Sequence, residues 1–469
     1  MAETALAPNT KTRSWGVLPQ IALAVVAVVA LATGALNVRP LFDRGAGAIA
    51  PAESSAVDAL VGVGERPETA LDGQIASLQA TLRDGDEYTT GLAATMLGQA
   101  YVQKARESGD PSWYPKAETL FLQALEIDKD NVEAMVGLGT LELARHQFAA
   151  ALEWGERAKA ADQSAAPVYG VIGDAQTELG RYDEALATIQ TMIDLRPDLR
   201  SYARVSYVRE LMGDREGAIA AMEQAVTAGA GYAENVAWVR VQLGNLRFDG
   251  GDLDGAGRDY AAALAAVPDY APALAGQGKV AAAEGDFERA AAVYGQAVRA
   301  IPLPEFLAAY GDVLTAAGRT EEAATQFALV EAIQQLYAAS GVEIDLELAL
   351  FTADHGAAED LPRAVERARA AVAARPSIFA YDTLAWTLYR SGDLNGAAAA
   401  SEQARRLGTR HALLEFHAGM IAAARGDRAE AISLLEGALA LNPYFSVRYA
   451  PEARETLERL RAGDEEKVR

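Results

Sequence analysis

The six-residue turn GDFERA at 285–290 recurs in variant form along the chain, and this repetition constrains the fold more than any other feature. Its seven copies begin at Gly180, Gly213, Gly251, Gly285, Gly318, Gly392 and Gly426. When the chain is aligned on the last residue of the turn, the aligned alanines are Ala117, Ala151, Ala185, Ala218, Ala256, Ala290, Ala323, Ala364, Ala397 and Ala431. Their spacings are 34, 34, 33, 38, 34, 33, 41, 33 and 34 residues. A period near 34 is typical of a solenoid of stacked units that share one core.

Residues at fixed offsets from the aligned alanines predict that each unit is a pair of antiparallel helices. A small residue stands twelve positions before most of them, at Gly139, Gly173, Ser206, Gly244, Gly278, Gly311, Ala385 and Gly419. Glycine in mid-helix costs about 1 kcal/mol relative to alanine, so its recurrence predicts a close crossing of the two helices. Four positions after the alanine, a larger side chain is expected to fill the space, as at Ile189, Met222, Tyr260, Tyr294, Phe327 and Leu435.

The recurrent turn itself is interpreted as a helix boundary. Its glycine can adopt the left-handed conformation that ends the first helix. We expect the residue after the glycine to stay in solvent, and the acidic or polar residue that follows to lie at the positive N-terminal end of the second helix. A proline twelve positions after the alanine, as at Pro197, Pro268, Pro302, Pro376 and Pro443, is expected to end that second helix.

This combination of period, small residue, turn glycine, aligned alanine and closing proline resembles the tetratricopeptide repeat, and in particular bacterial membrane-anchored proteins of that family. The resemblance extends from about Leu92 to Tyr444 and implies an all-α solenoid of about ten helix-turn-helix units that forms a right-handed superhelix. Three units depart from the pattern. The first carries an insertion at 105–114, the fifth is offset at 228–232, and the eighth is expected to have a stretched first helix and turn at 351–364.

The N-terminal region differs from the repeats. Residues 14–38 contain no charge, and the run from Ile21 to Ala32 is wholly apolar. Because roughly 20 apolar residues cross a bilayer as a helix, we expect a transmembrane helix or signal anchor at 15–38. A cleaved signal peptide, with Lys11 and Arg13 as its basic region, is one alternative, and a soluble helix is another.

The remaining boundaries follow from composition. A polar segment at 1–14 precedes the span and a flexible linker at 39–66 follows it. The solenoid is expected at 67–448, and a capping helix with a charged tail at 449–469. Basic residues flank the apolar span on both sides, so they determine its orientation only weakly. We expect a single-pass membrane protein with the solenoid outside the cytoplasm; secretion after cleavage, or a position on the cytoplasmic face, are the alternatives.

Family resemblance implies that the inner face of the superhelix is lined by the first helix of each unit and binds an extended or helical peptide. Residues fifteen, eleven and eight positions before each aligned alanine share one face of that helix. With two arginines added, the expected partner-binding residues are Asp174, Arg200, Arg204, Tyr207, Asn245, Phe248, Lys279, Asp312, Asp382, Trp386, Tyr389, Phe416 and Met420. The C-terminal aromatic residues are expected to be exposed anchors for the partner. The alternative, that Trp386 and Phe416 pack between units, is left open.

Arg200 and Arg204 lie one helical turn apart and could together grip a partner carboxylate. Some tetratricopeptide proteins hold a C-terminal carboxylate with lysine, asparagine and arginine from three units. The neighbouring inner positions here are Val136, Thr140, Gly170 and Asp174, so most of such a clamp is absent. Solvation or ion pairing of the two arginines is the favoured interpretation.

Composition excludes several other functions. The chain has no cysteine, which removes thiol nucleophiles and thiolate metal sites, and its net charge of -23 argues against nucleic acid as a partner. Of the four histidines, only His411 and His417 are near each other, and their spacing of six is poor for joint metal ligation on one helix face; the pair Asp354–His355 is interpreted as a solvated turn. We therefore predict no enzyme, no cofactor and no metal, but a protein-binding scaffold, adaptor or assembly factor of undetermined oligomeric state. A structural repeat protein without a specific client, and an unrecognised enzyme or small-ligand binder, are the alternative functions.

Overall fold

The computed structural model describes residues 69–229 and 233–463, and every regular element within them is a helix. The expected polar segment, transmembrane helix and linker at 1–66 lie outside the described residues. Within 69–229 and 233–463, no helix is both long enough and apolar enough to cross a membrane.

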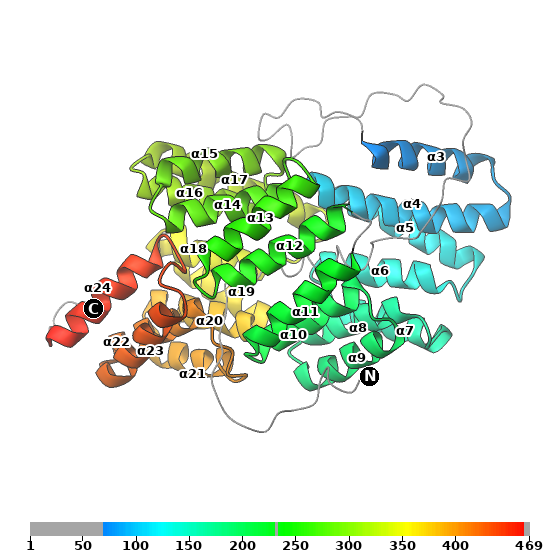
Figure 1. Ribbon diagram of the computed structural model, residues 1–469. Helices are drawn as coiled ribbons and strands as arrows, with labels where there is room; N and C mark the ends of the chain where they lie inside the picture. Colours follow the sequence, from blue (N-terminus) through cyan, green and yellow to red (C-terminus); the bar gives the residue numbers. More distant parts are fainter. Residues whose placement is uncertain (1–68, 230–232, 464–469) are drawn as a thin grey trace.

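The all-α prediction is confirmed by a continuous series of helical hairpins (Figure 1). Within the described ranges there are ten, which we number as units one to ten. They are α4 (Glu87–Ser108) with α5 (Trp113–Ile127), α6 (Val132–Ala144) with α7 (Phe148–Ala161), α8 (Ala166–Glu178) with α9 (Tyr182–Leu195), α10 (Leu199–Leu211) with α11 (Arg215–Ala228), α12 (Ala233–Phe248) with α13 (Leu253–Ala266), α14 (Ala271–Ala283) with α15 (Phe287–Ala300), α16 (Pro304–Ala316) with α17 (Thr320–Ala339), α18 (Asp345–His355) with α19 (Leu361–Ala374), α20 (Ile378–Ser391) with α21 (Leu394–Ala404), and α22 (Ala412–Arg425) with α23 (Arg428–Leu441).

One further helix lies at each end of the series. Helix α3 (Ala70–Asp84) precedes unit one, and its start is fixed by a capping box between Thr69 and Asp72. Helix α24 (Tyr449–Ala462) follows unit ten and buries Tyr449, Ala453 and Leu457 on one face against the last core cluster. These helices cover the apolar ends that stacked repeats would otherwise expose to water.

The turn glycines behave as the sequence predicts. All seven have positive φ, from 69° at Gly180 to 90° at Gly392, and end the first helix of their units. In unit two, His146 takes the same place with φ 61°. The residue after the glycine is exposed at Asp252, Asp286 and Asp393, as expected, but most aspartates at this position also have a role that was not predicted. They cap the second helix by accepting a backbone N–H, as at Asp214, Asp252, Asp286 and Asp393.

The predicted helix crossing is also confirmed, and the structure identifies the partner of each small residue. A Cβ atom at Gly244 would lie 2.6 Å from the ring of Tyr260, and one at Gly278 would lie 2.7 Å from the ring of Tyr294. The small residue therefore makes room for the large side chain four positions after the aligned alanine. In unit four, Ser206 replaces glycine and its hydroxyl donates to the carbonyl of Ala218 over 2.7 Å.

The eighth unit differs from its prediction. Its first helix, α18, is short rather than stretched, with 11 residues. The extra residues of the 41-residue interval lie in α17, which has 20 residues, and in a turn that contains the 3₁₀ helix η1 (Ala358–Asp360). Helix α17 extends past the usual proline position because the sequence from 330 to 339 contains neither proline nor glycine.

The solenoid curls until its later units lie on its earlier ones, and we call this line of contact the seam. Hydrogen bonds cross it between residues 194 to 198 positions apart, which is about six units. They join Gln147 to Gly341, Ile378 to Tyr182, Thr409 to Leu211 and Asn442 to Phe248. Each connects the turn of one unit to the loop that precedes the sixth unit after it, or to the loop before α24. Successive turns of the superhelix, each about six units long, are thus in direct contact.

Apolar packing accompanies these hydrogen bonds. Tyr182 and Leu211 from the first part of the chain form one buried cluster with Ile378. Figure 1 shows the consequence, with α20 beside α10 although many helices separate them along the chain. Because the turns touch, the inner side of the solenoid is a narrow, partly enclosed space rather than an open groove.

Candidate functional site

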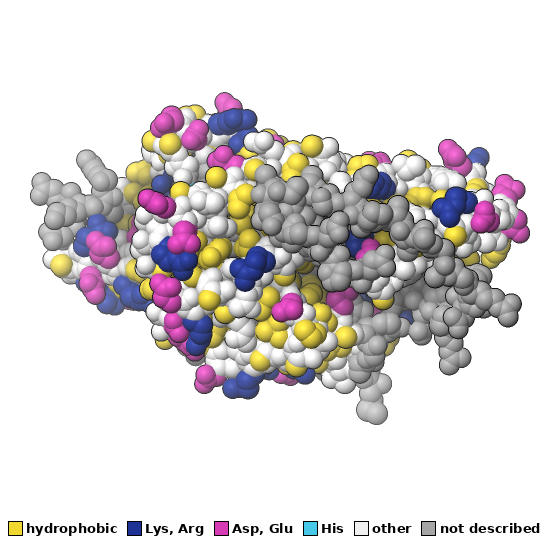
Figure 2. Space-filling model, turned by 90° about the horizontal axis from the view of Figure 1, so that it is seen from above, with side chains coloured by type: hydrophobic (Ala, Val, Ile, Leu, Met, Phe, Trp, Pro, Cys, Tyr) yellow, Lys and Arg dark blue, Asp and Glu magenta, His cyan; other side chains and the backbone are white. Residues whose placement is uncertain are grey.

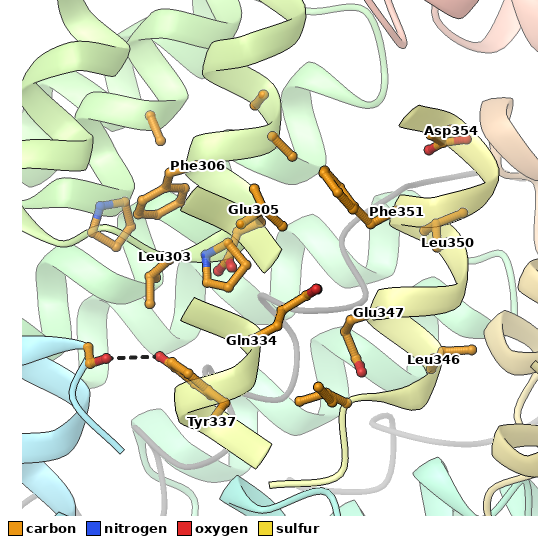
Figure 3. A pocket seen from close by; sticks show the side chains of 18 of the residues that line it. Leu303, Glu305, Phe306, Gln334, Tyr337, Leu346, Glu347, Leu350, Phe351 and Asp354 are labelled. Carbon is orange, nitrogen blue, oxygen red and sulfur yellow. Dashed lines mark hydrogen bonds between the residues drawn. The ribbon is translucent and has the colours of Figure 1, made fainter. Parts of the chain in front are cut away.

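A cavity of about 390 Å³ lies on the inner side of the solenoid (Figure 3). Its wall is formed mainly by the first helices of units five to eight, which are α12, α14, α16 and α18. The ends of α4 and α17 and the starts of α20 and α22 complete it. Gly109 and His146, from the turns of units one and two, close one side through the seam. First helices therefore line the inner face, as the sequence predicts.

In units five to seven, two of the three predicted positions of each first helix line the cavity, and the third, which includes Phe248, does not. The residues fifteen and eleven positions before the aligned alanine line the cavity, as Val241 with Asn245, Ala275 with Lys279, and Ala308 with Asp312. Asn245 accepts a hydrogen bond of 2.7 Å from the hydroxyl of Tyr260, which holds its amide in place. Phe248, on the next turn, is buried below the ammonium of Lys279, which lies 4.8 Å from the ring centroid.

Toward the C-terminus the expectation of exposed aromatic anchors is wrong. Trp386 is 1% exposed, stacked on Tyr389 and His417, and donates from Nε1 to Asp354 over 2.8 Å. Phe416 and Met420 are also buried, in the core between unit ten and α24. Tyr389 is half-buried. Only Asp382, among the residues expected from units nine and ten, lines the cavity.

The reason lies in how the last units join the cap. The ring of Tyr449 on α24 packs edge-on against Trp386, with 5.5 Å between the centroids, and stacks on Phe416. The cap thus covers the aromatic face that the sequence pattern left open. The interpretation that Trp386 and Phe416 pack between units is the correct one.

The residues expected from units three and four are engaged with one another. Arg204 donates from Nε and Nη2 to the carboxylate of Asp174 at 2.6 to 3.0 Å, and the side chains are only 2% and 4% exposed. Gly170 makes room for the guanidinium, since a Cβ there would lie 3.1 Å from Cζ of Arg204. Arg204 also bonds the carbonyl of Arg200. Tyr207 packs against the cluster of Tyr182 at the seam. Arg204 is therefore not available to grip a partner carboxylate.

Three further polar side chains line the part of the cavity that lies lower in Figure 3. None of them was predicted from the sequence. They are Glu305 from α16, Gln334 from α17 and Glu347 from α18 (Figure 3). Each has a buried oxygen, Oε1 of Glu305 and Gln334 and Oε2 of Glu347, with no hydrogen bond to any described residue. The other oxygen of Glu347 accepts from Arg375 over 2.8 Å.

Burial decides how these groups titrate. It raises the pKa of Glu305 to about 7, and the charge of Glu347 acts in the same direction. Burial would also raise the pKa of Glu347, but Arg375 and His146 outweigh it, so that pKa is lowered. Buried polar groups without partners are uncommon in folded proteins, and these three, which line one cavity, make it the candidate binding site.

The upper part of the cavity is acidic as well. Burial raises the pKa of Asp312 to about 7, with a further contribution from the charge of Asp354 and an opposing one from Arg448. His355 lies 3.8 Å from Asp312, and burial lowers its pKa to about 4. The interpretation of Asp354–His355 as a solvated turn is wrong, because both line the cavity and His355 stacks on Phe327 at 4.3 Å.

The described part of the face seen in Figure 2 lacks this concentration of one charge. Acidic and basic side chains are interspersed over the face seen in Figure 2. In the part of the chain that the structure describes, no group of three or more histidine, aspartate or glutamate side chains is placed to hold a metal ion. The cavity thus combines apolar walls with several carboxylate and amide oxygens that can accept hydrogen bonds.

Stacked helical hairpins with a lined inner cavity define a helical-repeat solenoid. Models of the tetratricopeptide repeat match residues 112–166, 241–303, 276–339 and 383–444, and a second such model matches 166–199. Together these matches cover more than half of the chain, and the chain belongs to the tetratricopeptide repeat family.

Three solved structures to which this chain is similar are distant. A thermophilic TPR protein of Thermus thermophilus is 24% identical over 40% of this chain and 98% of its own, with a TM-score of 0.36. A tetratricopeptide repeat protein from Parabacteroides merdae is 16% identical over 52% and 98%, with a TM-score of 0.38. The APC/C hetero-tetramer Cut9–Hcn1 aligns at 15% identity over 83% and 81%, also at 0.38. A search of curated proteins found no match.

Proposed function

We propose that this protein is a scaffold or assembly factor that holds a segment of a partner polypeptide on the inner side of its solenoid. We call the space that contains the cavity the channel. The observation that carries the proposal is the cavity itself, in which successive first helices present one continuous face. Its volume is at the lower end of the roughly 300 to 1,000 Å³ of ligand sites, so it fits one or two side chains of an extended segment. Asn245, Lys279, Asp312 and Asp382 are the expected groove residues placed to contact it.

Site-specific photo-crosslinking tests this function. A benzoylphenylalanine at Ala309, which lines the cavity, is expected to form light-dependent adducts with a polypeptide in the source cells. The same group at Ala149, exposed on the second helix of unit two, is the matched control. Equal adducts at both positions, or none at Ala309, would contradict binding in the channel.

The membrane anchor is part of the proposal. The uncharged run at 14–38 supports a single-pass anchor with the solenoid outside the cytoplasm. Because the chain has no cysteine, one cysteine at the exposed position Glu359 would report its location without background. Labelling by a membrane-impermeant maleimide in intact cells is expected. Labelling only after lysis would place the solenoid in the cytoplasm instead.

A second function has some support from the same cavity. Convergent polar groups around an apolar space also suit a small ligand. The polypeptide function is favoured because the wall continues across the first helices of six units, from α12 to α22. An enzyme is not proposed.

A further inference from the structure

The lower part of the cavity has more hydrogen-bond acceptors than donors. Oε1 of Glu305 and Oε2 of Glu347 have no donor among the described residues, and both are carboxylate oxygens. Gln334 is 4% exposed and its Oε1 is likewise without a partner among those residues. A buried acceptor that loses water without gaining a donor is costly. These three groups belong to different helices, so their meeting at one cavity is a property of the fold.

Positive charge in the cavity wall is used elsewhere. Arg106 donates to Glu234 over 2.8 Å, and Lys279 lies above the ring of Phe248 on the neighbouring helix α12. Arg375 donates to Oε1 of Glu347, and Nδ1 of His146 lies 3.6 Å from the same oxygen, so both leave Oε2 without a donor among the described residues. Glu305 forms no ion pair with a described residue, and the nearby charge of Glu347 repels its own. A cation with free donors is the group that this part of the cavity lacks.

The walls around these acceptors are apolar. Leu303, Phe306 and Phe351 lie around Glu305, Gln334 and Glu347, and Leu346 and Leu350 line the same cavity from the other side of α18 (Figure 3). A suitable occupant therefore has an apolar stem and a cationic tip. An ammonium group offers three donors and no acceptor, on a stem of four methylene groups in lysine. A carboxylate tip would be repelled, and an uncharged alkyl tip would leave the acceptors unpaired.

We propose that the cavity receives a lysine side chain of the polypeptide held in the channel, with its ammonium at Glu305, Gln334 and Glu347. Its stem lies against Phe351. This inference rests on the proposed function and names the chemistry of its partner. Glu305 is the specificity-determining residue, because it supplies a carboxylate that no described cation neutralises.

Matched synthetic peptides test the inference on the purified full chain. Twelve-residue alanine- and leucine-based peptides would differ only at one central residue, which is lysine, arginine, norleucine or glutamate. Binding would be measured by isothermal titration calorimetry. We expect the lysine peptide to bind at least about tenfold more tightly than the norleucine peptide, because hydrogen bonds to charged groups contribute on that scale. The glutamate peptide is expected to bind most weakly.

Two variants assign the effect to the cavity. Glu305→Gln keeps the shape of the side chain and is expected to remove the preference for lysine over norleucine. Glu359→Gln makes the same change at an exposed position and is expected to leave it unchanged. Circular dichroism of each variant shows that it is folded. A preference that survives in Glu305→Gln would overturn the assignment of the site.

The remaining outcomes separate the inference from the function on which it rests. If all four peptides bind equally, the channel binds polypeptide but the lysine site is wrong. If no peptide binds while free 1,5-diaminopentane does, the cavity is a small-amine site, and both the polypeptide function and its lysine partner are wrong. If neither binds, the inference and the channel function both fail.

Discussion

The backbone amide of Ile378 donates a hydrogen bond of 2.8 Å to the hydroxyl of Tyr182, although the two residues lie 196 positions apart. Ile378 is fully buried, so this N–H has no water to replace its partner. Tyr182→Phe is therefore expected to lower the free energy of unfolding by about 1 to 3 kcal/mol. Urea denaturation followed by circular dichroism measures the change.

The control is Tyr88→Phe, which removes the same hydroxyl from a side chain that is 82% exposed. Its effect should stay within about 0.5 kcal/mol. A similar loss in both variants would mean that the seam does not stabilise the solenoid.

The ion pair of Arg204 with Asp174 gives a second prediction. Arg204→Leu leaves the carboxylate of Asp174 buried without its partner, which typically costs about 3 to 5 kcal/mol. The double variant Asp174→Leu with Arg204→Leu is expected to recover much of that loss, since two apolar groups can replace a buried pair. Equilibrium unfolding of both variants tests this coupling.

An exposed pair serves as the comparison. Arg181 and Glu184 form a bidentate pair with side chains 44% and 50% exposed. Arg181→Leu should cost no more than about 1 kcal/mol. If Arg204→Leu also cost no more than about 1 kcal/mol, Arg204 could leave Asp174 at little cost. The interpretation that Arg200 and Arg204 grip a partner carboxylate would then be supported.

The pH dependence of stability supplies a third prediction. Burial raises the pKa of Asp249 to about 7, although Lys279 and Arg215 act in the opposite direction. The unfolded chain has the ordinary value near 4, so between these values the folded state binds the additional proton. Stability from this group is therefore complete below about pH 4 and is lost as the pH rises to about 7.

Asp249→Asn removes this titration. Its free energy of unfolding is expected to fall less steeply between about pH 5 and pH 7 than that of the wild type, by about 1 kcal/mol per pH unit. Asp254→Asn, at an exposed position of the same unit, should leave the wild-type slope. Denaturation at a series of pH values compares the three proteins, and equal slopes would show that Asp249 is ionised in the folded state throughout.

Much of the fold could be predicted because it depends on contacts between residues close together in the sequence, and these contacts recur from unit to unit. The left-handed glycine of a turn, such as Gly285, and the crossing of Gly278 with Tyr294 depend on residues close together in the sequence. Because these contacts recur in many units, the residues that form them repeat at a regular spacing in the sequence. The capping role of Asp286 was also local, but the turn alone did not show whether Asp286 or Glu288 would cap the second helix.

The candidate site was less predictable because it depends on the pitch of the superhelix. A residue such as Asp312 could be placed on the inner face from helix geometry alone. Glu305 lies seven positions earlier on the same face, so extending that stripe by two turns would have found it. Gln334 lies on the extension of a second helix, and the burial of Trp386 depends on Tyr449 of the cap, far along the sequence. No repeat pattern contains that information.

The glycines that flank Tyr260 give the last prediction. The ring is fully buried, and a Cβ at Gly276 would lie 2.5 Å from it while one at Gly244 would lie 2.6 Å away on the other side. Its hydroxyl is held by Asn245, so the ring cannot move aside. Gly276→Ala is expected to lower the free energy of unfolding by about 1 to 3 kcal/mol through overpacking. In contrast, Gly257 lies in mid-helix with nothing within 4 Å of its added Cβ, and Gly257→Ala should stabilise the protein by up to about 1 kcal/mol. Thermal and chemical denaturation of the two variants would show opposite signs; the same sign for both would mean that the packing of α14 on Tyr260 does not require a glycine at 276.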